Sequence, residues 1–277
     1  LPQSVLGQTN SCLQFDGIDD WVEIPETSDL DITTNLSVSI WAKTEDNITA
    51  KIIEKETWNS GWTIGQDKWN GWKVGFIGTS GGYSINWGDG IIPVYNQWYQ
   101  ITMTFDGTTL KLYVDGILKN STSTVGTIKL NNEPVSLGAD KGGQKFFEGC
   151  IDETAIWNTA LTASQITDLK DDYIDINNLP SGLVASQLIM YHSLDESQGE
   201  NEVFDSSTNG IDGFLRNMDA NTDRLASSIF DNDNQNLPIE LIEFSCQTED
   251  QYIEISWTTV SETNNDYFTI ERSEAGI

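Results

Sequence analysis

The chain has 277 residues, of which 43 are acidic and 14 are basic, and its formal net charge is -29 at pH 7. This charge repels phosphate backbones and anionic lipid surfaces, so we expect no nucleic-acid partner. The sequence contains no run of about twenty apolar residues, so we also expect no membrane span. The length is sufficient for one large β domain or two ordinary ones.

The first informative segment, residues 11–25, reads SCLQFDGIDDWVEIP. Its apolar residues alternate as in a strand, but Asp16, Asp19 and Asp20 interrupt the pattern. Gly17 permits a sharp turn that brings the three carboxylates and several free carbonyls together. Because Ca²⁺ takes about six to eight oxygen ligands in flexible geometry, this turn is a candidate partial calcium site. The alternative is a turn in which the aspartates accept hydrogen bonds from backbone amides.

The next part of the chain is predicted to form an antiparallel series of strands. The strand-like runs are LSVSIWA at 36–42, WYQITMTF at 98–105, LKLYV at 110–114 and a short run at 135–138. Each run either alternates or is continuous in β-branched and aromatic residues. The Asp-Gly pairs at 106–107 and 115–116 are typical of hairpin turns, so the order of strands predicts a meander.

Aromatic residues crowd the segment between the first two of these runs. Trp58, Trp69 and Trp87 have Asn, Lys, Gly and Asp as neighbours, which is the composition of loops, and Tyr83 lies in the same segment. An exposed ring of this kind can stack on a pyranose face while nearby amides bond the hydroxyls, so these four residues are candidate ligand contacts. The alternative is that the tryptophans hold their own loops against the protein surface.

Two features look catalytic in isolation but have the wrong context. The sequence GTSGG at 78–82 fits G-x-S-x-G, yet that motif needs a strand–turn–helix elbow, and here another strand is expected to follow. The single histidine, His192, lies in a strand-like run, and we interpret it as a packed strand residue. The sequence therefore indicates no catalytic residue.

The chain changes character after about residue 160. Thr162 and Gln165 have capping-box spacing and predict a short helix over 162–171. Residues 177–236 are polar and contain one strand-like run at 183–194. A new strand pattern begins at 237 and stops after three strands, which predicts an incomplete sandwich domain.

A second acidic loop, DSSTNGIDG, lies at 205–213. Its first positions follow an EF-hand loop, but Arg216 stands at the twelfth position, where a bidentate Glu is needed. Asp205, Asn209 and Asp212 are therefore a weaker candidate ion site, and the alternative is a loop closed by Asx turns.

Four segments resemble the laminin-G-like, concanavalin-A-like domains of secreted bacterial proteins. They are LQFDGIDDWVEIP, LSVSIWAK, WYQITMTFDGTTLKLYVDGIL and FEGCIDETAIWNTALTASQI. The resemblance implies an all-β fold, a jelly-roll sandwich of two antiparallel sheets with one short helix, over residues 10–176. It also implies that 177–236 is an accessory strand and Asp/Asn-rich loop that completes or follows the jelly roll.

The tail, 237–277, is similar to the start of the fibronectin-III-like segment found in substrates of the type 9 secretion system of the Bacteroidota. This resemblance implies a secreted or cell-surface protein that meets the type 9 secretion machinery during export. It is silent on the ligand.

The jelly-roll resemblance also bears on the candidate sites. Domains of this kind often carry a structural Ca²⁺ near the first strand and a closing G-x-I-D-E strand, which here adds Asp152 to Asp16 and Asp20, with Asp19 as a further ligand. Cys12 and Cys150 fall in the first and last strands of the resembled domain, so a disulfide between them is expected if the protein is exported. Two buried reduced thiols are the alternative.

These observations favour a non-catalytic, calcium-stabilised carbohydrate-binding or adhesin module whose partner is a glycan or a surface protein. The alternative is a protein-binding or structural spacer module. We rank a jelly-roll glycoside hydrolase last. Glu148 and Asp152 share a strand face, but the tight E-x-D-x-E array of jelly-roll glucanases is missing.

Overall fold

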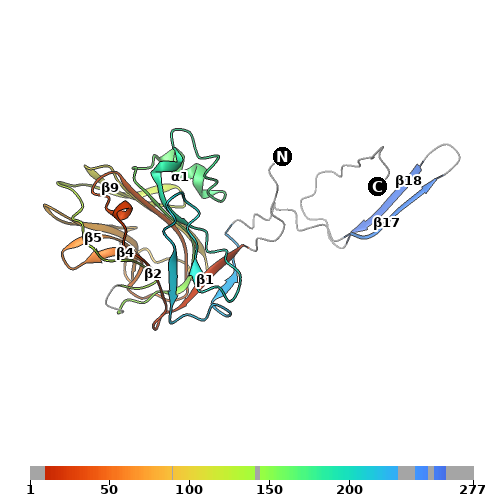
Figure 1. Cartoon of the computed structure of the whole chain (residues 1–277), viewed down its shortest axis with the longest axis horizontal. Coiled ribbons are helices and arrows are strands. Elements are labelled where there is room, and N and C mark those ends of the chain that lie inside the picture. Colours follow the sequence, from red (N-terminus) through yellow and green to blue (C-terminus); the bar gives the residue numbers. More distant parts are fainter. Residues whose placement is uncertain (1–9, 89, 141–143, 230–240, 249–252, 260–277) are drawn as a thin grey trace. The chain divides into compact units, whose positions relative to one another are not determined.

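The computed structural model describes residues 10–88, 90–140, 144–229, 241–248 and 253–259 (Figure 1). The chain divides into two compact units, residues 1–230 and 231–277. In the described part of the chain, no helix has the length and apolar character needed to cross a membrane.

The first unit is a sandwich of two eight-stranded sheets. In the first sheet the order is β10-β9-β8-β3-β12-β1-β16, and β13 also pairs with β12. These strands are β1 (Ser11–Asp16), β3 (Leu36–Thr44), β8 (Trp98–Phe105), β9 (Thr109–Val114), β10 (Ile117–Ser123), β12 (Glu148–Trp157), β13 (Leu188–His192) and β16 (Arg224–Ala226). The strand runs that alternation predicted at 36–42, 98–105 and 110–114 are confirmed as β3, β8 and β9.

The second sheet has the order β14-β15-β2-β11-β4-β5-β6-β7. Its strands are β2 (Trp21–Ile24), β4 (Ala50–Thr57), β5 (Ser60–Asp67), β6 (Gly71–Gly78), β7 (Gly81–Asn86), β11 (Val135–Leu137), β14 (Glu202–Val203) and β15 (Gly213–Arg216). Every strand pair within the two sheets is antiparallel. The expected all-β jelly-roll sandwich is therefore confirmed.

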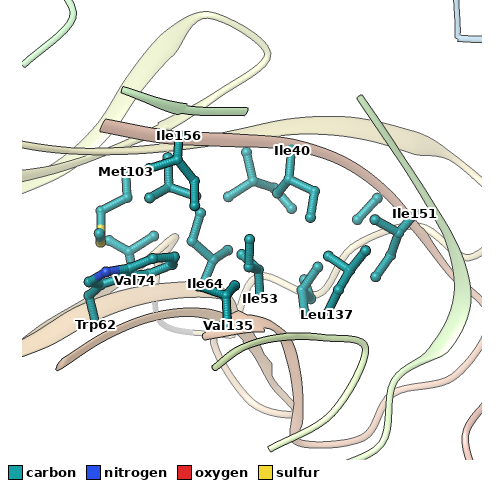
Figure 2. Close-up of a cluster of buried hydrophobic side chains, with 14 of the residues drawn as sticks. Ile40, Ile53, Trp62, Ile64, Val74, Met103, Val135, Leu137, Ile151 and Ile156 are labelled. Carbon is teal, nitrogen blue, oxygen red and sulfur yellow. The ribbon is translucent and has the colours of Figure 1, made fainter. Parts of the chain in front are cut away.

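The core lies between the two sheets, as Figure 2 shows. Alternate residues of each strand face inward, so apolar side chains from both layers meet there. The residues labelled in the figure come from the first sheet (Ile40, Met103, Ile151 and Ile156) and from the second (Ile53, Trp62, Ile64, Val74, Val135 and Leu137). Since the inner positions of β4, β5 and β6 supply this core, the residues between them point away from it.

A second, smaller cluster packs on the outer face of the first sheet under the helix α1 (Ala163–Lys170). The expected capping box is confirmed, because the Thr162 side chain accepts from the Gln165 backbone and the Gln165 side chain accepts from the Thr162 backbone. Ile166 is the residue of α1 that is buried in this cluster. The two short 3-10 turns are η1 (Ser28–Leu30) and η2 (Ala185–Gln187).

The polar segment 177–236 contributes strands to both layers. Its strand β13 pairs with β12 and its strand β16 pairs with β1, while β14 and β15 extend the second sheet beside β2. The segment therefore forms part of the sandwich and does not follow it as a separate element.

The second unit contains the antiparallel pair β17 (Leu241–Thr248) and β18 (Ile253–Thr259). Two of the three strands expected in the tail are therefore present. The third lies outside the described residues.

Candidate functional site

The outer face of β4, β5, β6 and β7 carries an open groove with a volume of about 430 Å³. Antiparallel register arranges its residues in rows that cross the strands. One row runs Lys51, Gly65, Lys73, Asn86, and the next runs Glu54, Thr63, Gly75, Ser84. The groove therefore presents ammonium, carboxylate, hydroxyl and amide groups on a sheet surface.

Glycines form the floor of this groove because the sheet leaves no room for side chains there. A Cβ atom added to Gly65 would lie 2.6 Å from the carbonyl oxygen of Ala50, and one added to Gly75 would lie 2.7 Å from that of Tyr83. Both distances are far below van der Waals contact with backbone atoms. The floor is consequently flat peptide surface, which lets a ligand approach the sheet closely.

Lys51 organises one side of the groove. Its Nζ lies 2.9 Å from Glu54 Oε2 and 2.8 Å from Glu56 Oε2, and it donates a hydrogen bond of 3.0 Å to Thr63 Oγ1. Burial by itself would lower the pKa of Lys51, but the two carboxylates outweigh that effect and raise it. The ammonium is therefore firmly charged and fixes the orientation of both carboxylates.

A second hollow of about 390 Å³ adjoins the groove and shares Lys51, Glu56 and Lys145 with it. Trp58 borders this hollow from the β4–β5 turn, and 90 % of its surface is exposed. Hydrogen bonds between Thr57 and its neighbours in the turn hold the backbone that carries this ring. An exposed ring beside a polar groove is an arrangement suited to stacking.

The other predicted aromatic contacts are not all available. Trp69 is 64 % exposed in the β5–β6 turn, with Lys68 Nζ 4.2 Å from its ring centroid. However, Trp69 is at the opposite end of β5 from Trp58, so one sugar ring cannot touch both. Trp87 packs on the core with its ring 5.3 Å from that of Tyr99.

Tyr83 is also engaged within the protein. Its ring packs 5.3 Å from that of Phe76. Its hydroxyl donates to the Val125 carbonyl at 3.2 Å and accepts from the Val125 amide at 3.0 Å. The alternative interpretation, in which aromatic residues hold their own loops, therefore describes Trp87 and Tyr83.

The aspartate turn after β1 brings Asp16, Asp19 and Asp20 together, with one carboxylate oxygen of each within 4.8 Å of the others. Burial, together with the neighbouring carboxylates of Asp16, Asp223 and Asp19, raises the pKa of Asp20 to about 6, although a hydrogen bond from the Asp16 amide opposes the shift. Asp16 Oδ1 also accepts from the Ile18 amide at 2.8 Å. The turn therefore has features of both interpretations. Its aspartates accept hydrogen bonds from backbone amides, as in a closed turn, and its three carboxylates still lie close together, as in a candidate calcium site.

Asp152 does not lie with this cluster. Register pairs Asp16 with Glu148 and Leu13 with Ile151, so Asp152 is at the other end of β1, roughly 13 Å along the strand from the turn. It is fully buried, and its pKa is raised well above the usual range by burial and by the charge of Glu153. The expected ligand set therefore has to be revised, since a cation held by Asp16 and Asp20 cannot also reach Asp152.

A β-bulge explains why two carboxylates are buried side by side at this place. Asp152 pairs with Trp41 and Ala155 with Ser39, so two residues of β12 face a single residue of β3. Glu153 has a φ of 48° within the bulge, and its carboxylate accepts a hydrogen bond of 2.5 Å from the Tyr191 hydroxyl. Burial likewise raises the pKa of Glu153 well above its usual range.

The loop after β14 is closed by its own hydrogen bonds. Asp205 accepts from the backbone amides of Tyr191, Ser207 and Ile211 at 2.8–2.9 Å, and Asp212 accepts from the Asp205 amide. Asn209 donates its side-chain amide to the Ile189 carbonyl at 2.8 Å. The Asx-turn alternative is the arrangement that the structure shows for this loop.

Cys12 and Cys150 are both free and buried, so the expected disulfide is not formed in this structure. Register pairs Cys150 with Gln14, which makes the two cysteines diagonal neighbours rather than direct partners. The two thiols are nevertheless in contact, because a hydrogen bond between them raises the pKa of Cys12 and lowers the pKa of Cys150. Cys150 Sγ also donates to Gln14 Oε1 at 2.8 Å.

The pair of carboxylates considered for hydrolysis is also separated by burial. Glu148 lies next to the aspartate turn and is partly exposed, whereas Asp152 has no exposed surface. His192 is buried with Nε2 2.8 Å from the Ile211 carbonyl, as expected for a packed strand residue. The segment 78–82 is confirmed as a strand–turn–strand hairpin between β6 and β7, not a nucleophile elbow.

The antiparallel two-sheet jelly roll is the architecture of concanavalin-A-like β-sandwich proteins. Residues 16–167 match the family model Laminin_G_3, described as the Concanavalin A-like lectin/glucanases superfamily. The match covers more than half of the chain, which therefore belongs to this family. No curated protein matches the chain in sequence.

The chain is similar to several solved structures. A presumed carbohydrate-binding protein from Bacteroides ovatus ATCC 8483 superposes with a TM-score of 0.58 at 16 % identity, over 76 % of this chain and 58 % of its own length. Domain 4 of AbnA, a GH43 extracellular arabinanase from Geobacillus stearothermophilus in complex with arabinotriose, has a TM-score of 0.49 at 25 % identity. This match covers 57 % of the present chain and 75 % of the other. A heptameric SAP-like pentraxin from Limulus polyphemus has a TM-score of 0.44 at 17 % identity, and the match covers 60 % of this chain and 83 % of that chain.

Of the residues that line the groove, Tyr83 alone was among those predicted from sequence. A usable signal was present, because Gly61, Thr63 and Gly65 alternate with Trp62 and Ile64 along β5, and β6 repeats the pattern. Small or polar residues at every second position of two neighbouring strands indicate an open sheet face.

Proposed function

We propose that this protein is a non-catalytic carbohydrate-binding module that holds a sugar chain in the groove above β4–β7. The observation that carries the proposal is the groove itself, an open trough with a glycine floor and a polar lining. Sugar rings need close approach for van der Waals contact and several fixed donors and acceptors for their hydroxyls. Ser84 and Lys73 line the trough and supply such groups.

Trp58 is the proposed stacking residue. Covering about 100 Å² of apolar ring and sugar surface contributes about 2.5 kcal/mol, a large share of the affinity of a weak glycan complex. The name of the Bacteroides ovatus structure supports a carbohydrate ligand, and the shared family supports the same class of function. Trp69 is proposed as a secondary contact for a longer chain, because it is exposed at the far end of the same strand.

The test is a glycan array followed by titration of tryptophan fluorescence with any oligosaccharide that binds. We expect Trp58→Ala to lower the affinity by at least tenfold and Trp69→Ala to lower it less. Thermal melts of both variants should match the parent, because both rings are exposed. Failure of the parent protein to bind any glycan would reject the proposal, and so would full affinity in Trp58→Ala.

We also propose that Ca²⁺ stabilises the turn formed by Asp16, Asp19 and Asp20. The three carboxylates are close together, and Asp223 adds a further negative charge nearby. A divalent cation would relieve this repulsion and would be bound by the native state alone, which raises stability. The expected result is a melting temperature that rises with added CaCl₂ and falls with EDTA, and an unchanged value would reject the site.

A protein partner is the second candidate for the function, as an adhesin or as a spacer in a larger surface protein. One observation favours it: the loop after β7 exposes Ile91, Ile92, Val94 and Tyr95, each to between 42 % and 60 %. Adjacent exposed apolar residues often mark an interaction surface. Binding of a cell-surface protein that is lost in Val94→Asp, with no glycan bound, would favour this alternative.

The cellular setting is likewise a proposal. We propose that the protein acts at the cell surface or outside the cell after export by the type 9 secretion machinery. Mass spectrometry of the culture supernatant and outer-membrane fractions of the producing strain, before and after loss of that machinery, tests the route. Detection in the cytoplasm alone would reject it.

A further inference from the structure

The distribution of lysines around the groove is unexpected for so acidic a protein. The chain has 14 basic residues among 277, yet Lys51, Lys73 and Lys145 all line this one groove. At physiological ionic strength the Debye length is about 8 Å, so distant surface carboxylates are largely screened from a ligand in the groove. Glu56 and Asp67 also line the groove, so the ligand meets a local balance of charges in which the lysines without a carboxylate partner matter most.

The three lysines differ in how far their charge is already compensated. Lys51 forms ion pairs with Glu54 and Glu56 and is neutralised within the protein. Lys73 has no ion pair with any residue that the structure describes, and its side chain is partly buried in β6. An ammonium in a groove that has no carboxylate partner can form a charge-assisted hydrogen bond with an anion supplied by a ligand.

The position of Lys73 makes it reachable from the floor of the groove. Its row neighbour on β5 is Gly65, and the next residue of that row on β4 is Lys51. Lys51 and Lys73 are therefore two strand spacings apart, about 9.6 Å, with no side chain between them. A sugar ring fits in this interval, with the Lys73 ammonium at one side and the Glu54–Lys51–Glu56 group at the other.

From this geometry we infer that the groove selects sugar chains that carry a carboxylate, that is, chains containing uronic acid residues. The inference rests on the proposed carbohydrate-binding function and specifies its ligand class. Lys73 binds the uronate carboxylate, while the Glu56 carboxylate held by Lys51 accepts hydrogen bonds from ring hydroxyls. Lys145, exposed between the groove and the Trp58 hollow, provides a second contact for the next acidic sugar.

The balance of lysines and carboxylates at the groove also limits how much negative charge the ligand can carry. Glu54, Glu56 and Asp67 contribute negative charge at the groove, so a chain with several charges on each sugar would be repelled. One carboxylate per sugar, or fewer, matches the uncompensated ammonium groups. Heavily sulfated chains are therefore expected to bind more weakly than uronate chains.

The experiment is isothermal titration calorimetry of the whole chain against matched oligosaccharides. The probes are hexamers of galacturonate, of mannuronate and guluronate, and of hyaluronan, each paired with its carboxyl-reduced counterpart, which differs only in the loss of the acid group. Heparin hexasaccharide is the sulfated probe. We expect at least one uronate chain to bind about tenfold more tightly than its reduced form, with affinity that falls as salt rises.

Variants separate the role of Lys73 from general charge. Lys73→Gln should lower the affinity for the uronate chain to that of the reduced chain, and Lys73→Arg should restore most of it. Lys111→Gln, on β9 in the other sheet, removes the same charge and should leave binding unchanged. Melting curves of all three variants check that each is folded.

The possible outcomes distinguish failure of the uronate selection from failure of the proposed carbohydrate binding. Equal affinity for acidic and reduced chains, tightest binding of heparin, or full uronate affinity in Lys73→Gln overturns the selection for uronates while leaving carbohydrate binding intact. Binding of neutral glycans alone does the same. Absence of binding to every acidic and neutral glycan overturns both.

Discussion

Lys51→Met tests the charge network that shapes the groove. The substitution removes the ammonium that contacts Glu54 Oε2 at 2.9 Å and Glu56 Oε2 at 2.8 Å. Loss of one partner of a fully buried pair costs about 3–5 kcal/mol, because the remaining charge stays desolvated. The side chains of Glu54, Lys51 and Glu56 are 4 %, 15 % and 23 % exposed, so solvent relieves part of this cost. We therefore expect a loss of about 2–3 kcal/mol at pH 7, or about 4–12 °C in Tm.

The assay is urea unfolding followed by tryptophan fluorescence at pH 7 and pH 5. The variant loses an ammonium that stabilises charged carboxylates, so the loss should be greatest at pH 7 and should be relieved as the pH falls and carboxylates are protonated. The double variant Lys51→Met/Glu54→Gln should recover part of the loss at pH 7. A loss below about 0.5 kcal/mol, or one that is the same at both pH values, would refute the reasoning.

Three further outcomes are expected. In EDTA, the folded-state pKa of Asp20, about 6, exceeds its unfolded value, so this group lowers the stability of the protein as the pH rises from about 4 to about 6. Asp20→Asn should remove that part of the decline, as measured by urea titrations at several pH values. A variant that shows the same decline as the parent would contradict this expectation. Gly65→Ala should cost about 1–3 kcal/mol in the same assay, because its Cβ would lie 2.6 Å from the Ala50 carbonyl oxygen, and an unchanged midpoint would be evidence against the tight floor. Because Cys12 and Cys150 are free thiols, dithiothreitol should leave Tm unchanged, and a fall in Tm would reveal a disulfide.

Local sequence patterns predicted much of the fold. Alternation identified β3, β8 and β9, and the spacing of Thr162 and Gln165 identified the start of α1. These features depend on residues that are neighbours along the chain, so their physical basis is already present in a short segment. The aspartate turn is of the same kind, because Asp16, Asp19 and Asp20 are within five residues of one another.

Predictions that joined distant segments were less successful, because they depended on strand register. Placing Asp152 beside the aspartate turn required β1 and β12 to pair about four residues away from the observed register. The observed register also makes Cys12 and Cys150 diagonal neighbours rather than direct partners, and both are free thiols. Register is set by the packing of the whole sheet face, which no single segment reveals.

By itself the sequence determined the class of structure, the positions of most strands and the turn that gathers three aspartates, since period-two alternation, Asp-Gly pairs and capping residues act over a few residues. Only the tertiary structure decided which aromatic residues are exposed, and only it brought Lys51, Lys73 and Lys145 around a glycine floor. The reason is geometric. Rows across a sheet are made by residues from separate strands, and their neighbours are chosen by pairing and core packing rather than by position along the chain.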